Sequence, residues 1–386
     1  MDVILTPEQE AFRDRLRTIV DAHILPRSAE IDESTEVPWD IMRLLAEQSV
    51  QGIVIPEEYG GIGAGVEALP ISLAREQLMR GSCNVDSLFA MQGLGSYPVI
   101  LGGDQELKRA VLPPIAKAEK LAAYAVTEPA AGSDVAAIET RAERRGDGYI
   151  INGRKIFTSN AGVAATYVVL AKTNPSAGVK GISALLLDGD TPGFRTTEQF
   201  DLIAPHITGA IEMRDCYVPA NRLLGKEGDG FKIAMQTFDV YRASVGAAAV
   251  GLAQGAMEEA LAYALHRKQF GQPLADFQIT QFKIADMATE IDAARMLVYR
   301  AAKLKDLGAA RVTKEASMAK LFATEMAGRV VDQALQIHGG RGLRKGVRIE
   351  RLYRQARAMR IYEGTSEIQR LIIGRTVIAE SERGRK

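Results

Sequence analysis

Cysteine is nearly absent from the chain, and this excludes two kinds of architecture. Cys83 and Cys216 are the only cysteines, and they stand far apart without the close spacing of zinc ligands. A disulfide framework and a structural zinc site therefore do not fit this sequence. No second histidine or cysteine stands at metal-ligand spacing from His338, so we expect no metal ion. This cysteine usage favours a reducing compartment, and we expect the protein in the cytoplasm.

A charge excess of either sign is also missing. Lysine plus arginine and aspartate plus glutamate both number 48, so the formal net charge is zero. No field over the whole chain attracts a nucleic acid or an anionic membrane. Arginines are dense between positions 341 and 360, but acidic residues and apolar Ile349 and Leu352 interleave with them. This mixture is typical of a solvated or inter-subunit helix face, and we expect no nucleic-acid partner.

Long apolar runs are absent as well. The sequence turns polar and charged from Thr6 onward, unlike a signal peptide. One of the longest uncharged runs, Ala243 to Met257, has about 15 residues of mostly small side chains, fewer than the roughly 20 that span a bilayer. We interpret this run as a buried helix and expect no membrane span.

The pattern of residue types changes twice along the chain. Apolar residues recur at helical spacing in the first third, short β-rich runs begin near Leu121, and alanine-rich helical patterns return from Gly230. This order, without internal repeats, predicts an α+β multidomain fold. The predicted domains are an N-terminal helical domain at 1–122, a middle antiparallel β-barrel or sandwich domain at 123–228, and a C-terminal four-helix-bundle domain at 229–386.

Two short glycine motifs need a structural interpretation. Asn152-Gly153 separates two β-rich runs, and Asn-Gly is the favoured pair for a tight hairpin turn, so we predict an antiparallel hairpin there. The stretch GGIGAG at 60–65 does not match G-x-G-x-x-G, and no apolar parallel strand clearly precedes it. We therefore predict a loop that leads into a helix near Leu69, and not a dinucleotide-binding turn.

Glu363 stands at a position suited to a catalytic carboxylate. It is followed by Gly364, and Ser366 with Gln369 forms an S-x-x-Q pattern that predicts a capping box at the start of a helix. Glu363 would then lie on a turn just before a helix. Such a turn can project one carboxylate into a cavity from a well-held element.

Four segments, in this order along the chain, carry a resemblance to a known family. They read YAVTEPAAGSD at 124–134, YALHRKQFG at 263–271, QIHGG at 336–340 and IYEGTSEIQR at 361–370. Together they resemble the acyl-CoA dehydrogenases, over essentially the whole chain. The resemblance implies a homotetramer, a dimer of dimers, with one FAD per subunit between the sheet domain and the C-terminal helices. It also implies an acyl-CoA substrate, electron transfer to an electron-transfer flavoprotein, and a role in fatty acid or carboxylic acid catabolism.

The resemblance implies a reaction in which Glu363 takes the α-proton of an acyl thioester and the flavin accepts the β-hydride. The α-proton is weakly acidic, so the site must stabilise enolate-like charge while a nearby carboxylate takes the proton. A desolvated glutamate has a raised pKa and is a better base near neutral pH. The product of this reaction is a 2-enoyl-CoA.

The matching segments also imply the residues that hold cofactor and substrate. Residues of the cofactor's own subunit should face the flavin or its pyrophosphate: Tyr124, Val126, Thr127, Ser133, Phe157, Ser159 and Thr365. Others should reach the FAD of the neighbouring subunit: Arg267, Phe270, Gln278, Gln336 and Gly340. Ser133, Asp239 and Arg242 match contacts to CoA. A surface ion pair remains the alternative for Asp239 and Arg242, and simple turn chemistry for the TEPAAGSD loop.

One segment departs from the family pattern. Relatives commonly carry an arginine and small hydroxyl residues before the Val-Pro dipeptide, whereas this chain reads LIAPHITGAIEMRDCYVP at 202–219. The departure favours a short, branched or alicyclic acyl group over a long straight one. Two alternatives stay open: an acyl-thioester oxidase or carrier-protein-linked dehydrogenase on the same scaffold, and a flavin-free helical binding protein.

Overall fold

The computed structural model describes residues 5–383, which cluster into two compact units built from non-adjacent segments. The first unit combines the segments up to Ser34, Glu67–Asp86 and from Arg242 onward, and the second combines Thr35–Val66 and Ser87–Tyr241. Residues 1–4 and 384–386, at the outer ends of the predicted first and third domains, lie outside the described part. The boundaries at 122/123 and 228/229 remain predictions.

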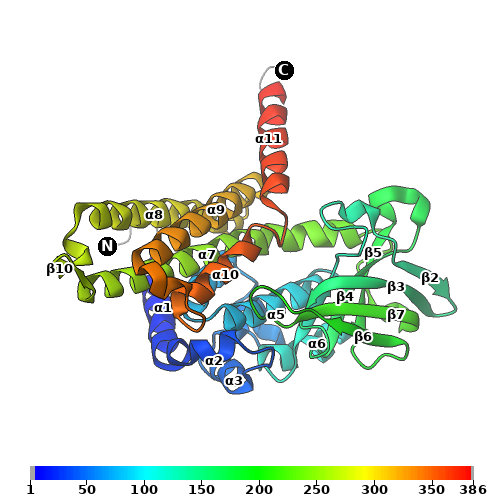
Figure 1. The fold of residues 1–386 in the computed structure, drawn as a ribbon. Helices are drawn as coiled ribbons and strands as arrows, with labels where there is room; N and C mark the ends of the chain where they lie inside the picture. The colour runs from blue at the N-terminus through cyan, green and yellow to red at the C-terminus, as the bar shows by residue number, and fades with distance from the viewer. Residues whose placement is uncertain (1–4, 384–386) are drawn as a thin grey trace. The chain divides into compact units, whose positions relative to one another are not determined.

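The first unit is helical. Its helices, together with the short hairpin that joins two of them, are α1 (Pro7–Ile19), α2 (Ser28–Asp32), α4 (Ala68–Gly81), the start of α5 (Cys83–Gly102), most of α7 (Gly230–His266), β9 (Lys268–Gln269), β10 (Gln272–Pro273), α8 (Gln278–Asp306), α9 (Thr313–His338), α10 (Arg348–Met359) and α11 (Ser366–Arg383). Helices α7, α8 and α9 run side by side, and α11 projects beyond them (Figure 1).

Small side chains allow the close helix packing of the first unit. A Cβ atom at Gly251 of α7 would lie 2.0 Å from the carbonyl oxygen of Glu76 in α4, so only glycine fits there. On α9, Ala316, Ala319 and Ala323 are fully buried. The predicted buried helix at 243–257 is confirmed, because this run lies within α7 and nearly all of its residues are buried.

The second unit contains the sheet and its neighbouring helices. Its elements are α3 (Trp39–Glu47), the rest of α5, α6 (Gln105–Ala116), β1 (Ala122–Ala125), β2 (Arg141–Arg145), β3 (Gly148–Ser159), β4 (Thr166–Lys172), β5 (Ile182–Asp188), β6 (Phe194–Gln199), β7 (Thr208–Pro219), β8 (Leu223–Leu224) and the start of α7. Short 3₁₀ turns connect several of them.

All eight strands from β1 to β8 belong to one sheet, with β6-β7-β3-β2-β4-β5-β8 as its order and β1 beside β4 (Figure 1). Most neighbours are antiparallel, but β4 pairs in parallel with both β1 and β2. Strands β4 and β5 are buried along almost their whole length, whereas β6 is a largely exposed edge strand. The short β-rich runs predicted to begin near Leu121 correspond to this sheet, which extends from β1 to β8.

The hairpin predicted at Asn152-Gly153 is wrong. Both residues lie within the single strand β3, and the pairing of β3 with β7 shifts in register between Ile151 and Gly153. The tight turn instead joins β2 to β3, where Arg145 pairs with Gly148 and Gly146 has a φ of +60°. The register shift between Ile151 and Gly153 marks a β-bulge, and glycine is required there because a Cβ on Gly153 would lie 2.3 Å from Thr140 Oγ1.

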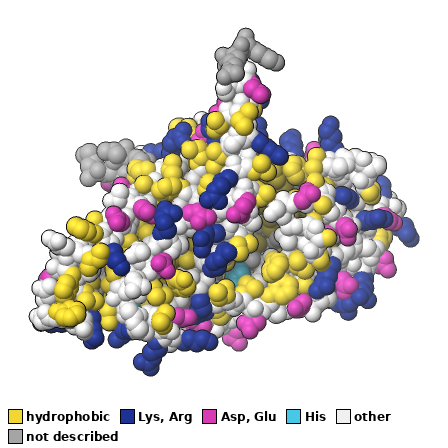
Figure 2. All heavy atoms as spheres, turned by 45° about the horizontal axis from the view of Figure 1, so that its top comes forward, with side chains coloured by type: hydrophobic (Ala, Val, Ile, Leu, Met, Phe, Trp, Pro, Cys, Tyr) yellow, Lys and Arg dark blue, Asp and Glu magenta, His cyan; other side chains and the backbone are white. Residues whose placement is uncertain are grey.

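The GGIGAG stretch forms the predicted loop. It follows a 3₁₀ turn, with no strand before it, and leads into α4 at Ala68. Among residues 5–383, no helix has the length and apolar character needed to cross a membrane. Side chains of both charge signs are mixed over the face that Figure 2 shows.

Candidate active site

Glu363 lies on the turn between α10 and α11, as predicted, and its backbone is strained. Its φ is +52°, in the left-handed region that costs a residue with a Cβ free energy, and Gly364 follows with a φ of +95°. Such a conformation persists only where surrounding contacts hold it. The turn is therefore a fixed and unusual feature of this chain.

Side chains from α9 and α11 hold this turn. The Lys320 Nζ atom donates a hydrogen bond of 2.8 Å to the carbonyl oxygen of Gly364. Gln369 Nε2 donates to the same oxygen at 3.0 Å and to that of Glu363 at 3.3 Å. Ser366 Oγ donates to Glu325 Oε1 at 2.6 Å, which ties the start of α11 to α9. These contacts hold the backbone from Glu363 to the start of α11.

The predicted capping box is wrong in its cap residue. Helix α11 begins at Ser366, and the Thr365 hydroxyl accepts the backbone N–H of Ile368 at 3.4 Å. Thr365 is thus the N-cap, because the Ser366 hydroxyl already bonds to Glu325. Gln369 reaches back to the turn carbonyls and not to the N–H of the cap.

The environment of the Glu363 carboxylate makes it a stronger base than an ordinary glutamate. The side chain as a whole is half-buried, but its Oε2 atom is fully buried and has no hydrogen-bond partner within residues 5–383. Burial raises the pKa of Glu363, and the positive charges of Arg75, Lys320 and Arg242 only partly oppose this shift. A carboxylate that is desolvated yet surrounded by cations can hold a proton or release it.

A buried ion pair stands beside this carboxylate. Arg75 of α4 donates to both oxygens of Asp86 in α5, at 2.8 and 3.0 Å, and to Ser244 Oγ of α7 at 3.0 Å. Both charged side chains are almost fully buried. The paired, planar contact keeps both groups ionised and binds three helices together. Asp86 is therefore engaged internally by Arg75.

In the second unit, a buried lysine shapes the start of the TEPAAGSD loop. Lys155 Nζ of β3 donates to Glu128 Oε1 at 2.7 Å and to the carbonyl oxygen of Val126 at 3.1 Å. Glu128 also accepts the backbone N–H groups of Glu139 and Thr140. Burial lowers the pKa of Lys155 to about 8, although Glu128 opposes the shift. Residues 126–128 are thus held against β3 after β1 ends.

Aromatic side chains near this loop suit a planar ring. Phe157 has a φ of +51° and is 58% exposed, and its ring centroid lies 4.9 Å from that of Phe200. The buried Tyr124 hydroxyl has no hydrogen-bond partner within the described residues, and its ring contacts Phe238 edge-on. Open space surrounds Gly132, where an added Cβ would meet nothing within 4 Å. An exposed aromatic face, an accessible glycine and an unpaired hydroxyl fit the ring and phosphates of a flavin cofactor.

The second unit also places a histidine against two hydroxyl groups. His206 Nε2 lies 2.9 Å from Ser159 Oγ and 3.4 Å from Ser87 Oγ. Burial lowers the pKa of His206 to about 4, so the imidazole is neutral at ordinary pH. Sequence reasoning singled out the segment around His206 as a departure, but did not assign this residue a role.

The predicted site residues are divided between the two units. The second unit holds Tyr124, Val126, Thr127, Ser133, Phe157, Ser159 and Asp239. The first holds Arg242, Arg267, Phe270, Gln278, Gln336, Gly340, Glu363 and Thr365. Among the latter, those predicted to reach a neighbouring subunit are all exposed, and Phe270 is 94% exposed. Their assignment to cofactor or substrate remains a prediction.

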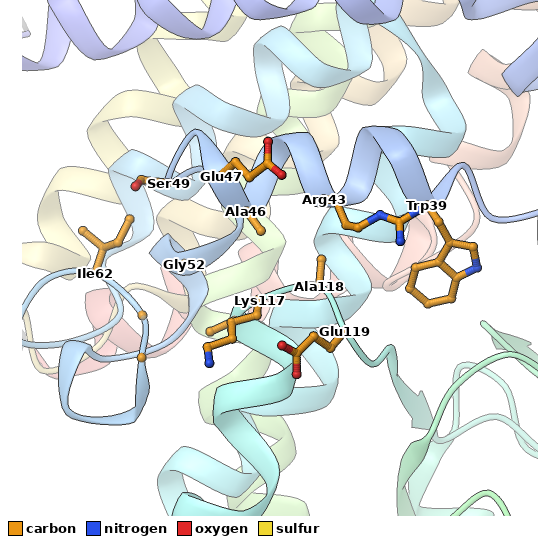
Figure 3. Close-up of a pocket in the computed structure, with 13 residues that line it drawn as sticks. Trp39, Arg43, Ala46, Glu47, Ser49, Gly52, Ile62, Lys117, Ala118 and Glu119 are labelled. Atoms are coloured by element: carbon orange, nitrogen blue, oxygen red, sulfur yellow. The ribbon is translucent and has the colours of Figure 1, made fainter.

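A large surface pocket shares no residue with this predicted site. It has a volume of about 890 Å³ and opens between α3, the glycine loop at 60–62 and the end of α6 (Figure 3). Arg43, Glu47, Lys117 and Glu119 supply charges of both signs to its walls. Ser49 and Ala118 of its lining have a positive φ, but no described residue of the lining carries a fully buried polar side-chain atom without a hydrogen-bond partner. The pocket therefore carries no argument for catalysis.

Sequence reasoning missed Arg75 and Lys320. Each is a charged residue inside an apolar helical pattern, LPISLAREQLM at 69–79 and MAKLFA at 318–323. A charge on the buried face of a helix is rare unless it is paired, so these positions did carry a signal. The partner of each charge lies far away in the sequence, and only the fold identifies it.

Comparison with known proteins assigns the chain to a family. The acyl-CoA dehydrogenase N-terminal, middle and C-terminal domain models match residues 6–119, 123–216 and 228–378. The probable acyl-CoA dehydrogenase YngJ of Bacillus subtilis is 43% identical, over 98% of this chain and 100% of its own length. The cyclohexane-1-carbonyl-CoA dehydrogenase of Geobacter metallireducens is 40% identical, over 97% of this chain and 98% of its own length.

Solved structures agree with this assignment. The butyryl-CoA dehydrogenase of Megasphaera elsdenii superposes with a TM-score of 0.92 at 36% identity, covering 98% of this chain and 100% of its own. An acyl-CoA dehydrogenase of Bacillus anthracis, solved in complex with FAD, has a TM-score of 0.89 at 31% identity, covering 99% of this chain and 68% of its own. The N-terminal helical, middle sheet and C-terminal helical regions of the predicted fold are thereby confirmed. The chain belongs to the acyl-CoA dehydrogenase family and is an oxidoreductase of this FAD-dependent class.

Proposed function

We propose that the chain converts an acyl-CoA thioester into the 2-enoyl-CoA, with Glu363 as the base that takes the α-proton. The observation that carries the proposal is the state of the Glu363 carboxylate. One of its oxygens is buried without a hydrogen-bond partner among the described residues, its pKa is raised by burial, and its backbone is held in a strained turn. A base with these properties is oriented before the substrate arrives and is poised to take up a proton near neutral pH.

The reaction removes a proton and a hydride from neighbouring carbons. The α-proton moves to a Glu363 oxygen, and the double bond forms as the β-hydride leaves. FAD, when bound, supplies the two-electron acceptor for that hydride. The cations Arg75, Lys320 and Arg242 around Glu363 limit the rise of its pKa, so a useful fraction is ionised when substrate binds.

The residues assigned to the cofactor divide into two sets. Tyr124, Val126, Thr127, Phe157 and Ser159 would face the ring, and Ser133 and Thr365 the rest of FAD. The Lys155–Glu128 pair supports this assignment because it holds the backbone of residues 126–128 in place. Ser133, Asp239 and Arg242 would contact the CoA portion of the substrate.

The second set would come from a neighbouring subunit of a homotetramer. Arg267, Phe270, Gln278, Gln336 and Gly340 are exposed at the hairpin, the start of α8 and the end of α9. Large apolar side chains are exposed at and beside this hairpin as well: Leu265, Phe270, Ile279 and Phe282. Exposed apolar residues in such number support an interface with another copy of the chain. An electron-transfer flavoprotein as acceptor and a cytoplasmic location belong to the same proposal.

A short, branched or alicyclic acyl group is the proposed substrate class. The support is the unusual segment 202–219 and the 40% identity to an enzyme that acts on cyclohexane-1-carbonyl-CoA. The test is anaerobic bleaching of the visible flavin absorbance by a panel of straight, short, branched and cyclic acyl-CoAs. Bleaching by the short, branched or cyclic members supports the proposal, and bleaching by long straight chains alone contradicts the substrate class.

A further inference from the structure

His206 is a half-buried polar side chain that the proposed reaction does not use. It lies in the loop before β7, within the segment 202–219. Its Nε2 atom lies 2.9 Å from the hydroxyl of Ser159, at the end of β3, and 3.4 Å from that of Ser87 in α5. Three elements of the second unit therefore meet at one imidazole.

The backbone fixes this arrangement. Ser159 pairs with Thr208 in the ladder between β3 and β7, and the N–H of Asn160 donates to the carbonyl oxygen of Ile207 at 2.9 Å. His206 directly precedes these paired residues, so the end of the sheet holds its backbone beside Ser159. The imidazole reaches the Ser159 hydroxyl from this fixed backbone position.

The neutral imidazole imposes a direction on the hydroxyl. One ring nitrogen of a neutral histidine donates and the other accepts. If Nε2 accepts, Ser159 must donate to it and presents only lone pairs on its other side. If Nε2 carries the proton, Ser159 accepts and its own O–H is available elsewhere. Nε2 offers only one donor or one acceptor position, so Ser87 at 3.4 Å shares this position with the closer Ser159.

We propose that His206 is a positioning residue that orients the Ser159 hydroxyl and thereby tunes the reduction potential of the bound flavin. The inference rests on the proposed function, in which Ser159 faces the FAD ring. Reduction of a flavin adds a proton and changes which ring positions donate and accept. A hydroxyl of fixed direction therefore stabilises one redox state more than the other.

The test measures the flavin midpoint potential and visible spectrum of the FAD-loaded protein without any acyl-CoA. His206→Leu should change the ratio of oxidised to reduced flavin at a fixed potential by about 3- to 10-fold, as expected for one hydrogen bond. For a two-electron couple this corresponds to a shift of about 15 to 30 mV. His206→Gln, which keeps a hydrogen-bonding group at similar reach, should keep the midpoint potential close to the wild-type value. His23→Leu, a change at an exposed histidine, is the matched control.

The double variant shows whether His206 acts through Ser159. In the Ser159→Ala background, His206→Leu should cause no further shift. An unchanged potential in His206→Leu, or an equal shift with and without Ser159, would overturn the proposal. If His206→Leu does not fold, a difference between His206→Gln and the shorter His206→Asn supports the proposal, and identical potentials in the two overturn it.

The same data separate this inference from the proposed function. A yellow protein that no acyl-CoA reduces would contradict the proposed reaction, while a shift in His206→Leu would still support the role of His206. A wild-type protein that binds no FAD would overturn both.

Discussion

The Lys320 ammonium group donates a 2.8 Å hydrogen bond to the carbonyl oxygen of Gly364, the residue that follows Glu363. Lys320 is fully buried on α9, and burial lowers its pKa to about 8. A buried lysine is unfavourable unless it is paired, so this position retains a charge at a cost in stability. Its charge also opposes the rise in the pKa of Glu363. One side chain thus both holds the turn and limits the basicity of the carboxylate.

Lys320→Met should move the acidic limb of the rate profile to higher pH. Without the ammonium charge, the pKa of Glu363 rises further above its ordinary value. The base works only when deprotonated, so activity is lost at a higher pH as the pH falls. The measurement is kcat/KM against pH for both proteins. Lys314→Met, at a lysine of the same helix that pairs with Glu380, is the control and should leave the profile in place. Superimposable profiles for wild type and Lys320→Met would contradict this electrostatic role.

Glu128→Gln should destabilise the protein far more than the loss of an exposed ion pair. The change leaves the Lys155 charge buried without its carboxylate, which costs about 3–5 kcal/mol. Arg154→Ala breaks the pair with Glu198 on the same sheet, where both side chains are about half exposed, and should cost under about 1 kcal/mol. Urea denaturation measures both values. Equal costs would contradict a structural role for the buried pair.

Gly364→Ala should lower kcat while FAD stays bound. The φ of +95° is unfavourable for alanine, and its Cβ would lie 2.5 Å from Gln369 Nε2. Displacing Gln369 removes its hydrogen bonds to the carbonyls of Glu363 and Gly364, so the carboxylate loses its fixed position. Gly374→Ala, on α11 with open space around it, is the control and should not reduce activity. Steady-state kinetics and flavin content are measured for both variants. An unchanged kcat in Gly364→Ala, or a kcat that falls only because FAD is lost, would contradict this role of the turn.

Phe270→Ser should weaken subunit assembly and FAD binding together. Phe270 is 94% exposed at a positive φ and is proposed to reach the cofactor of a neighbouring subunit. Leu307→Ser removes another apolar side chain, 82% exposed, that lies outside the predicted site. The molecular mass from light scattering and the bound FAD from visible absorbance should decrease together for Phe270→Ser and stay unchanged for Leu307→Ser. A monomer that retains FAD would contradict the shared site.

Local patterns were sufficient to predict much of the fold and the place of Glu363. The short β-rich runs of the middle third mark real strands, and the small-residue run at 243–257 marks a buried helix. The turn at Glu363 was also predictable, because glycine and a capping sequence follow it. These features depend on residues close together in the chain.

The rest depended on contacts between distant residues. Asn152-Gly153 has a hairpin sequence, but pairing with β7 keeps β3 continuous and absorbs the glycine as a bulge. The sequence pattern is compatible with Ser366 as the N-cap of α11, but the Ser366 hydroxyl donates to Glu325 of α9. Thr365 accepts the backbone N–H of Ile368 and is the N-cap. In the same way, the roles of Lys320 and Arg75 follow from their contacts with Gly364 and Asp86, which lie elsewhere in the sequence. Tertiary contacts here override local propensity.

The most direct test of the central claim is the rate of flavin reduction in Glu363→Gln. It is measured without oxygen, by rapid mixing of the FAD-loaded variant with the acyl-CoA that bleaches the wild-type flavin. The amide keeps the shape of the side chain but cannot take a proton, so FAD should stay bound while the reduction rate falls by about 10²- to 10⁴-fold or more. Glu367→Gln, an exposed change in the first turn of α11, should reduce its flavin at the wild-type rate. Reduction at an undiminished rate in Glu363→Gln would contradict the account, because the α-proton would then have another acceptor.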